Sequence, residues 1–519
     1  MPRQFSAKLA SEQVVKKSTV VGSLGNSVFK QTEFQGLILI VSACVLFIGF
    51  KWFYPYPSFF YDGYSYIYAA AQHLDVNIWP IGYSRFLSFF HSITTSAGAL
   101  VGFQFIVFLL SALYFYFTIH HFFLLSKHTR LILSFFLFYN PLFYYLNNYI
   151  SSDGLFITLS LLWFTQLIWM IHQPNVYLFC SQGIITFILF TLRYNAMIYP
   201  IVAIVPFIFI KAKVWQKILG ISVAPMLIIP FIIFTGNAAK RITGVTQFPP
   251  IRGGWQWANN ALYMRDFLSI DSKSFPTKET QELDQTVQNY FKTIPSKFRN
   301  LSASEVDFFI CDLNSPLYQY MHKHYRPDPN YDSTISAWGR AAVVFDHYGK
   351  YLISRYPLSF SRHFLLINAS KYFLPPLEVL EVYNTGRKEM QPTAQLWFHY
   401  PNRRVSCFSY TCQQNILRPF SLGFMIANIL LVLTFSIAIQ KRLFNSTPKT
   451  INYTVLTTSI FIFLNFSFST FANIINLRYQ IFPMILIVTL CIILLDQLER
   501  FSVGKKTPKI LFAYSKCND

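Results

Sequence analysis

The stretch that decides the fold is residues 54–91, YPYPSFFYDGYSYIYAAAQHLDVNIWPIGYSRFLSFFH. It follows one long apolar segment and precedes another, so we expect it to lie outside the hydrocarbon at one face of a membrane. The stretch contains Asp62 and Asp75, and the only other acidic residue between positions 34 and 265 is Asp153. Ionisable side chains near lipid are rare and are usually kept for function. These aspartates are therefore the first candidates for chemistry.

The composition of the whole chain also indicates a membrane protein. Of its 519 residues, 53% are hydrophobic and 19% aromatic, whereas only 13% are charged, which is outside the range of soluble globular domains. The formal charge of +21 could suit a nucleic acid, but a footprint for phosphate backbones gathers on one soluble face. These basic residues are instead spread over many short connections, so we expect no nucleic-acid partner.

Ten apolar segments are candidates for crossing a bilayer, which takes roughly 20 residues per helix. The sequence therefore predicts an all-α polytopic membrane protein with about ten transmembrane helices and one large extracytoplasmic domain that is mostly α-helical. The ten segments are 35–53, 99–123, 131–149, 155–172, 176–192, 196–210, 218–235, 419–440, 453–475 and 480–496.

Lysine and arginine in the short connections predict the orientation, because cytoplasmic loops carry an excess of both. An even number of crossings then places both termini in the cytoplasm. The composition, rich in Asn and Phe, favours a bacterial inner membrane, with the endoplasmic reticulum membrane as an open alternative. The predicted divisions are a basic cytoplasmic arm at 1–34, an N-terminal transmembrane catalytic module at 35–235 that includes the first outer loop at 54–98, an extracytoplasmic domain at 236–418, C-terminal transmembrane helices at 419–496 and a cytoplasmic tail at 497–519.

Asp62 and Asp153 each stand where a helix is expected to begin, and two interpretations apply to both. Aspartate is a favoured N-cap residue, so each could serve only to start its helix. For Asp153, Ser151 or Ser152 could provide the cap without placing a charge at the bilayer surface. A capping role and a catalytic role are also compatible. We therefore assign Asp62 and Asp153 as candidate catalytic residues and give Asp75 a structural role.

Two outer turns have nearly the same sequence, Leu-Arg-Tyr-Asn at 192–195 and Leu-Arg-Tyr-Gln at 477–480. Each places an arginine, Arg193 or Arg478, at the outer end of a predicted span. A guanidinium there can bind phosphate oxygens, or it can snorkel to the interface without any ligand. Arginine on this side runs against the positive-inside rule and the sequence recurs, so we assign both as candidate phosphate ligands.

The large outer segment contains aromatic and acidic candidates. Trp255 and Trp257 could stack on sugar rings as substrate-binding residues, or they could belong to an aromatic belt at the interface. Glu378 and Glu381 follow a pair of prolines and are backup candidates for a base or a metal ligand. The simpler alternative for both glutamates is a solvated helix face.

Absent motifs narrow the chemistry. The chain contains no Walker loop, no Gly-x-Ser-x-Gly and no His-Glu-x-x-His, which are signatures of NTP hydrolysis, serine hydrolysis and zinc proteolysis. The predicted spans also lack the chain of acids and histidines that a proton-driven pump needs.

The first outer loop resembles that of the GT-C superfamily of polytopic glycosyltransferases, which includes protein O-mannosyltransferases and the bacterial lipid A aminoarabinose transferase. In those families an aspartate in this loop is followed by a tyrosine and later by a Pro-x-Gly-Tyr-like turn. The corresponding residues here are Asp62, Tyr66 and the Pro-Ile-Gly-Tyr at 80–83. The resemblance implies that Tyr66 and Tyr83 contact substrate.

The resemblance extends to two later motifs. Ser-Asp-Gly-Leu-Phe at 152–156 is similar to the second acidic site of those families, and Arg478 with its following tyrosine is similar to an Arg-Tyr motif near the end of many such chains. The likeness covers about residues 35–235 and 419–496. Many members carry two adjacent acids at the first site, whereas Tyr and Gly flank Asp62 here, so a divalent cation stays possible without being assigned.

The resemblance implies a specific chemistry. The donor is a sugar on a polyprenyl phosphate, the leaving phosphate is stabilised by an arginine, and a carboxylate accepts the proton of the attacking hydroxyl. Asp62 is then the general base, and Asp153 orients the acceptor or the surroundings of Asp62. A single in-line displacement inverts the anomeric centre. The acceptor is a glycan, lipid or protein hydroxyl, and no organic cofactor is implied.

Two other classes of protein stay open. A transporter or flippase of a lipid-linked saccharide would use the same arginines without a base, and a non-catalytic membrane scaffold would need neither aspartate. The transferase interpretation has a structural requirement that the others lack. Both carboxylates and at least one of the two arginines must line one outer cavity that opens laterally to lipid.

Overall fold

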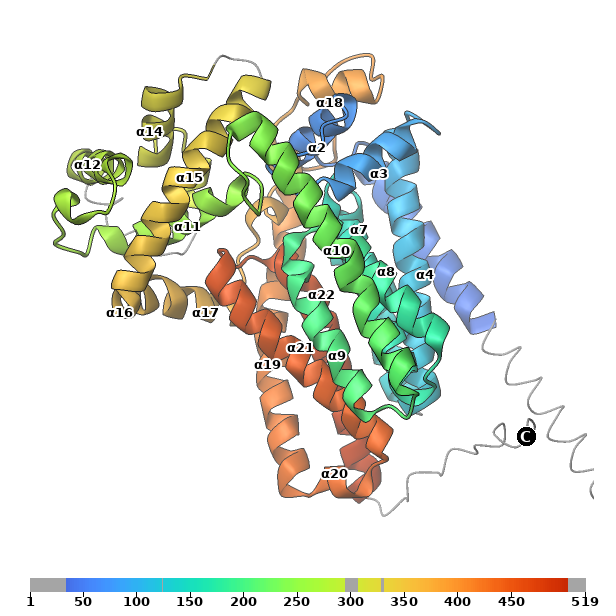
Figure 1. Cartoon of the computed structure of the whole chain (residues 1–519). Helices are drawn as coiled ribbons and strands as arrows, with labels where there is room; N and C mark the ends of the chain where they lie inside the picture. Colours follow the sequence, from blue (N-terminus) through green and yellow to red (C-terminus); the bar gives the residue numbers. More distant parts are fainter. Residues whose placement is uncertain (1–33, 124, 295–306, 328–330, 503–519) are drawn as a thin grey trace, which may run out of the picture.

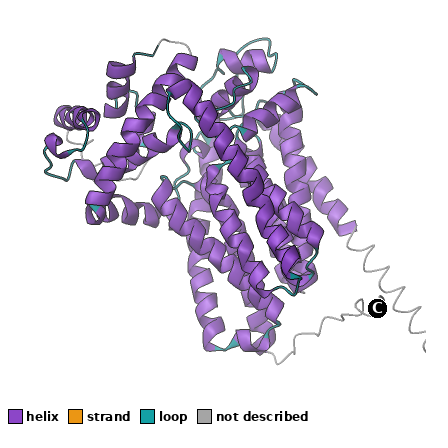
Figure 2. Cartoon of the chain, in the orientation of Figure 1, coloured by secondary structure: helices purple, strands orange, loops and turns teal. Residues whose placement is uncertain are grey.

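Helices dominate the computed structural model (Figures 1 and 2). No strand forms among the described residues, apart from two isolated bridges, so the predicted all-α class is confirmed there. The predicted arm at 1–34 and tail at 497–519 lie almost entirely outside this part of the chain. The residues that the structure describes are 34–123, 125–294, 307–327 and 331–502.

Seven helices of the described chain are long and apolar enough to cross a membrane. The chain is therefore a multi-pass membrane protein. The seven helices are Phe34–Phe53, α4 (Ala97–Phe123), α7 (Ser152–His172), α10 (Val214–Thr243), α19 (Cys412–Gln440), α21 (Lys449–Ala472) and α22 (Leu477–Ser502).

Three of the ten predicted spans take other forms. The segment 131–149 is two shorter helices, α5 (Lys127–Phe138) and α6 (Pro141–Asn147). The break falls at Asn140, whose side chain accepts from the backbone N–H of Leu142, and Pro141 has no N–H to continue the first helix. The other two are short apolar helices, α8 (Val176–Leu192) and α9 (Tyr199–Phe209), with the 3₁₀ turn η1 (Tyr194–Ile198) between them.

Helix α22 lies inside the helical bundle. It packs against α7, α19 and α21, and nearly all of its apolar length is buried. The helix Phe34–Phe53 and α10, by contrast, expose most of their apolar surface. Contiguous apolar surface of this kind marks an interaction site for lipid or protein, and its place on spanning helices fits lipid. The first turn of α22 is thereby held by the surrounding helices of the bundle.

Helix α10 runs past the predicted boundary at residue 235 and ends at Thr243, where Gly244 adopts the left-handed conformation of a helix C-cap (φ 82°). Beyond it, α11 (Arg252–Arg265) packs along α15 (Tyr331–Arg355), as Figure 1 shows. A Cβ at Gly254 would lie only 1.8 Å from a backbone oxygen of α15, so glycine permits this approach. The neighbouring helices are α12 (Lys278–Thr293), α13 (Phe308–Cys311), α14 (Pro316–Tyr325), α16 (Pro357–Phe360) and α17 (Leu366–Phe373).

The segment predicted as one domain at 236–418 divides between two hydrophobic cores. Its buried apolar residues from 251 to 364 pack mainly on one another, and we call this part the 251–364 unit. Its buried apolar residues from 372 to 405 instead join the core of the long helices. There, α18 (Pro392–Trp397) packs on α2 (Tyr61–Ala71), which lies in the first outer loop at 54–98. The later part of the segment thus covers that loop.

Candidate functional site

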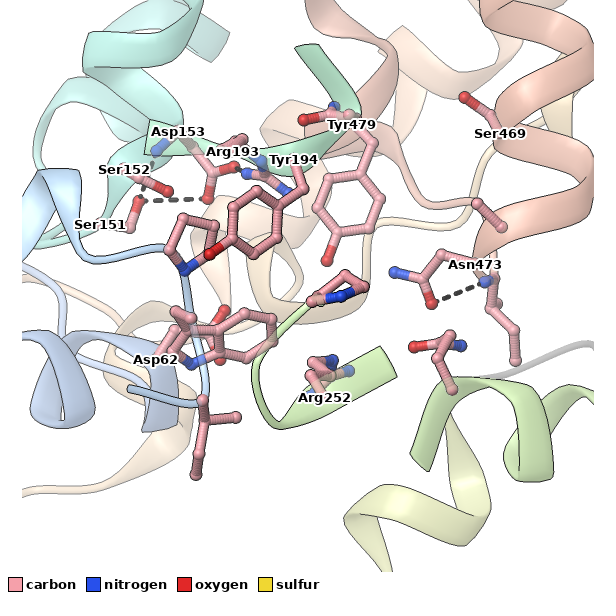
Figure 3. Close-up of a pocket in the computed structure, with 18 of the residues that line it drawn as sticks. Asp62, Ser151, Ser152, Asp153, Arg193, Tyr194, Arg252, Ser469, Asn473 and Tyr479 are labelled. Carbon is pink, nitrogen blue, oxygen red and sulfur yellow. Dashed lines mark hydrogen bonds and ion pairs between the residues drawn. The ribbon is translucent and has the colours of Figure 1, made fainter. Parts of the chain in front are cut away.

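Four residues assigned from the sequence meet at one end of the helical bundle, and Figure 3 shows three of them, Asp62, Asp153 and Arg193. Asp62 lies in the first turn of α2, Asp153 in the first turn of α7, Arg193 at the end of α8 and Arg478 in the first turn of α22. Asp62, Asp153 and Arg193 line one cavity of about 200 Å³. Arg478 lies behind the cavity wall and contacts both carboxylates.

Arg478 binds three carboxylates. Its Nη1 donates to Asp62 Oδ2 at 3.0 Å and to Asp153 Oδ2 at 3.4 Å, and its Nε donates to Glu378 Oε2 at 3.0 Å. Only 6% of the side chain is exposed, and a guanidinium this deeply buried is strongly destabilising without partners. The three acids therefore hold Arg478 in place, and Arg478 in turn fixes the positions of the acids.

Arg193 reaches Asp153 from the other side. It forms an ion pair with Oδ1 of Asp153, whereas Arg478 contacts Oδ2. The ring of Tyr479 contacts both arginines, with its centroid 4.5 Å from the Arg193 guanidinium carbon and 4.7 Å from that of Arg478. Both contacts are cation–π interactions. The two Leu-Arg-Tyr turns thus deliver their arginines to one carboxylate and one aromatic ring.

Neither aspartate acts as the N-cap of its helix. The cap of α7 is Ser151, whose hydroxyl accepts from the backbone N–H of Asp153 and donates to its carboxylate. The cap position of α2 is Phe60, which offers no side-chain acceptor. Both carboxylates instead occupy first turns, where the positive end of the helix dipole favours a negative charge. The capping interpretation therefore does not account for either residue.

The two carboxylates differ in access. The side chain of Asp62 is 16% exposed and that of Asp153 is 4% exposed. Asp62 uses Oδ2 for Arg478, and no hydrogen bond or ion pair within the described chain involves its Oδ1. Asp153 has both oxygens engaged by arginines. Asp62 is therefore the more accessible of the two carboxylates, and Asp153 is the more tightly held.

Close packing explains why glycine follows Asp62. A Cβ at Gly63 would lie 2.6 Å from the backbone oxygen of Ile150, which directly precedes the start of α7. A second acid at position 63 is therefore sterically excluded in this arrangement. Gly82, at the start of α3 (Gly82–His91), is similar, because its Cβ would lie 2.5 Å from the backbone oxygen of Thr191.

The two tyrosines of the first loop have different positions. Tyr66 lines the cavity, and its hydroxyl lies 3.0 Å from the hydroxyl of Ser152. Burial, reinforced by Asp62, raises the pKa of Tyr66 above its usual value, so the phenol is protonated at neutral pH. Tyr83 is not among the residues that line the cavity, and its hydroxyl donates to Gln104 at 2.8 Å. Its ring supports that of Tyr66 edge-on, at a centroid distance of 5.0 Å.

The two predicted tryptophans do not line this cavity. Trp255 is fully buried in the 251–364 unit, where it stacks on Trp338 at 4.1 Å and donates to that residue's backbone oxygen. Trp257 packs edge-on against Phe471. Asp75 lies on the surface in ion pairs with two arginines, which agrees with its structural assignment.

Of the two backup glutamates, only Glu378 reaches the site. Burial raises its pKa, Arg478 opposes that shift, and Asp62 adds to it. Glu378 also has a left-handed backbone (φ 53°), which costs energy for a residue with a Cβ and is found most often at functional sites. In the described chain no group of three or more His, Cys, Asp or Glu side chains is placed to hold a metal ion.

The wall of the cavity formed by the 251–364 unit carries polar residues that the sequence reasoning missed. Arg252 and Gln256 lie in the first turns of α11. Asn473, between α21 and α22, and Gln480, in the first turn of α22, line the same cavity from outside this unit. Arg252 lies over the ring of Trp79 at 4.2 Å. The only sequence signal for Arg252 was its place directly before two glycines at a helix start.

The arrangement can accept a proton and hold an anion in the same space. A carboxylate oxygen of Asp62 without a partner in the described chain and the guanidinium of Arg193 share one cavity, and Arg478 contacts Asp62 from behind its wall. Comparisons with protein-family models, with curated proteins and with solved structures found no match to this chain.

Proposed function

We propose that this protein is a membrane glycosyltransferase that moves a sugar from a polyprenyl-phosphate donor to an acceptor hydroxyl. The observation that carries the proposal is the shared cavity of Asp62, Asp153 and Arg193, with Arg478 bridging the two acids. A GT-C-like enzyme requires this convergence, and the four residues come from helices far apart in the sequence. A cavity at the end of membrane-spanning helices would also suit a donor whose tail stays in the bilayer.

In this mechanism the acceptor oxygen attacks the anomeric carbon while the bond from that carbon to the phosphate oxygen breaks. The hydroxyl proton goes to Oδ1 of Asp62, the oxygen without a partner in the described chain. The bonding electrons leave with the polyprenyl phosphate, whose negative charge Arg193 stabilises from the cavity wall and Arg478 stabilises from behind it. Attack from the face opposite the phosphate inverts the anomeric centre. Tyr66 borders the space in which the sugar would lie.

The proposal includes a membrane placement. Ten crossings, counting α8, α9 and the α5–α6 pair with the seven long helices, put both termini in the cytoplasm and the cavity on the opposite face of a bacterial inner membrane. On that face no nucleotide sugar supplies the donor, which fits a lipid-linked sugar. A glycan, lipid or protein supplies the acceptor hydroxyl, and a divalent cation is not required by any step.

The test compares two aspartates of the same loop. Purified protein in lipid nanodiscs is incubated with polyprenyl-phosphate sugars and candidate acceptors, as wild type, Asp62→Asn and Asp75→Asn. Asp62→Asn should abolish product while donor binding persists, and Asp75→Asn should keep wild-type turnover because Asp75 is a surface residue. Full turnover in Asp62→Asn would refute Asp62 as the base. Donor binding by the wild type with no product from any acceptor would refute the transferase and favour a transporter or flippase of lipid-linked saccharides.

A further inference from the structure

The cavity has a second positively charged wall, away from Arg193 and Arg478. Arg252 stands on this wall at the start of α11, and Figure 3 shows it on the opposite side of the cavity from Arg193. Its guanidinium lies over the ring of Trp79, which also lines the cavity. The function proposed above assigns no role to this arginine.

Arg252 uses little of its hydrogen-bonding capacity within the part of the chain that the structure describes. Within the described chain its only hydrogen bond runs from Nη2 to Asp307 Oδ2, at 2.8 Å. Asp307 is also satisfied by neutral amides, because its Oδ1 accepts from Gln256 at 3.0 Å and from Asn259 at 3.2 Å. Asp307 therefore fixes the orientation of the Arg252 guanidinium while accepting only one of its N–H groups. The remaining N–H groups of a guanidinium are suited to anionic oxygens.

The backbone adds to the positive potential. Helix α11 is 14 residues long, and its N-cap residue, Ile251, provides no side-chain acceptor for the first N–H groups. Gly253, in the first turn, lines the cavity and has no side chain of its own, and the ring of Pro249 packs beside it. A helix N-terminus with open N–H groups favours negative charge.

A buried donor in the same cavity also lacks a partner. Gln480 is fully buried and lines the cavity, and its Nε2 atom donates no hydrogen bond in the described chain. A buried amide N–H without a partner is destabilising, so this donor is suited to an oxygen of a ligand. Gln480 follows Tyr479, the residue whose ring joins the two phosphate-side arginines.

We infer that Arg252 and the first turn of α11 form a second anion site, which binds a carboxylate or phosphate carried by the acceptor. The assignment of this anion to the acceptor rests on the proposed transferase function. In an in-line displacement the acceptor approaches opposite the leaving phosphate, and Arg252 stands on the wall opposite Arg193. The substrate class is thus an anionic acceptor, such as a uronic-acid-containing or phosphorylated glycan.

The test measures binding, so it does not depend on turnover. Glucuronic acid and its neutral counterpart, glucose, are offered to the full-length protein in nanodiscs, and saturation-transfer NMR reports binding of each sugar. The wild type should give at least a five-fold stronger signal for glucuronic acid than for glucose. Arg252→Gln should remove this preference, and Arg252→Lys, which keeps the charge, should retain most of it. A glucuronic acid signal that is unchanged in Arg252→Gln would overturn the inference.

Two further arms identify the source of the anion. Arg193→Gln and pre-bound undecaprenyl phosphate should both leave the glucuronic acid signal unchanged, because they alter the other anion site. Displacement of glucuronic acid by undecaprenyl diphosphate but not by the monophosphate would show that Arg252 binds the second phosphate of a donor, and would overturn the assignment to the acceptor. Loss of turnover in Asp62→Asn tests the transferase separately, since neither binding arm uses that variant.

Discussion

Replacing Arg478 by lysine keeps the positive charge at the site but removes the planar guanidinium with its several donor nitrogens. In the structure two different nitrogens of Arg478 serve three acids, with Nη1 at 3.0 Å from Asp62 and Nε at 3.0 Å from Glu378. A single ammonium can keep one of these bonds. A hydrogen bond to a charged group is worth about 1.5–3 kcal/mol, so losing one that positions Asp62 should lower kcat/KM by roughly 10- to 150-fold.

The assay is the initial rate of sugar transfer, with the thermal unfolding midpoint measured on the same samples. Arg478→Lys should lower the rate far more than the unfolding midpoint. Arg478→Met, which leaves the buried Asp153 and the partly buried Asp62 and Glu378 without this partner, should lose about 3–5 kcal/mol of stability. The reasoning is refuted if Arg478→Lys has wild-type kcat/KM, or if Arg478→Met unfolds at the wild-type temperature.

Three further predictions concern stability and are checked by thermal unfolding of the full chain. Because burial raises the pKa of Glu378, its ionisation should make the wild type less stable as pH rises above about 4.3, and Glu378→Gln should lack this decline. For Asp284, burial would raise the pKa but Arg265 and several hydrogen bonds lower it. Asp284→Asn should therefore lower the free energy of unfolding by about 3–5 kcal/mol at pH 7. This difference between variant and wild type should shrink as pH falls below about 4. A difference that stays constant with pH would contradict the prediction. Gly63→Ala should cost about 1–3 kcal/mol by overpacking, whereas Gly102→Ala, where nothing lies within 4 Å of the added Cβ, should be harmless.

The general architecture was predictable because a long run of apolar residues identifies a membrane-spanning helix without further information. Seven of the ten predicted spans are single long helices, and each has an apolar run that needs no tertiary information. The break at Asn140 was missed because the apolar residues continue on both sides of it. There a local cap and a proline determine the structure, and hydropathy alone does not reveal them.

The convergence of Asp62, Asp153, Arg193 and Arg478 was foreseeable in part. Charged residues at the ends of apolar helices on one side of a membrane are confined to the same interfacial layer. Four such residues are therefore expected to lie near one another. What the sequence could not supply was the pairing, in which Arg478 bridges the two acids. That geometry depends on how α22 inserts among α7, α19 and α21.

The positions of Trp255 and Glu378 were not predicted correctly because they depend on contacts between residues far apart in the sequence. Trp255 resembles a surface aromatic in the sequence, but the contact between α11 and α15 encloses it. Glu378 lies 100 residues before Arg478 in the chain, and the segment around it is held by a backbone bond from Leu477 to Pro376. No local pattern predicts such a contact.

The most direct test of the central claim is a single-turnover measurement with Asp62→Asn and a radiolabelled polyprenyl-phosphate sugar. Donor bound to the variant and to the wild type is counted first, and sugar transferred to the acceptor is counted next in the same samples. If Asp62 is the base, the variant should hold the donor as well as the wild type does and transfer at least a hundred-fold more slowly, within the range expected for general base catalysis. Equal transfer by both proteins would contradict the account.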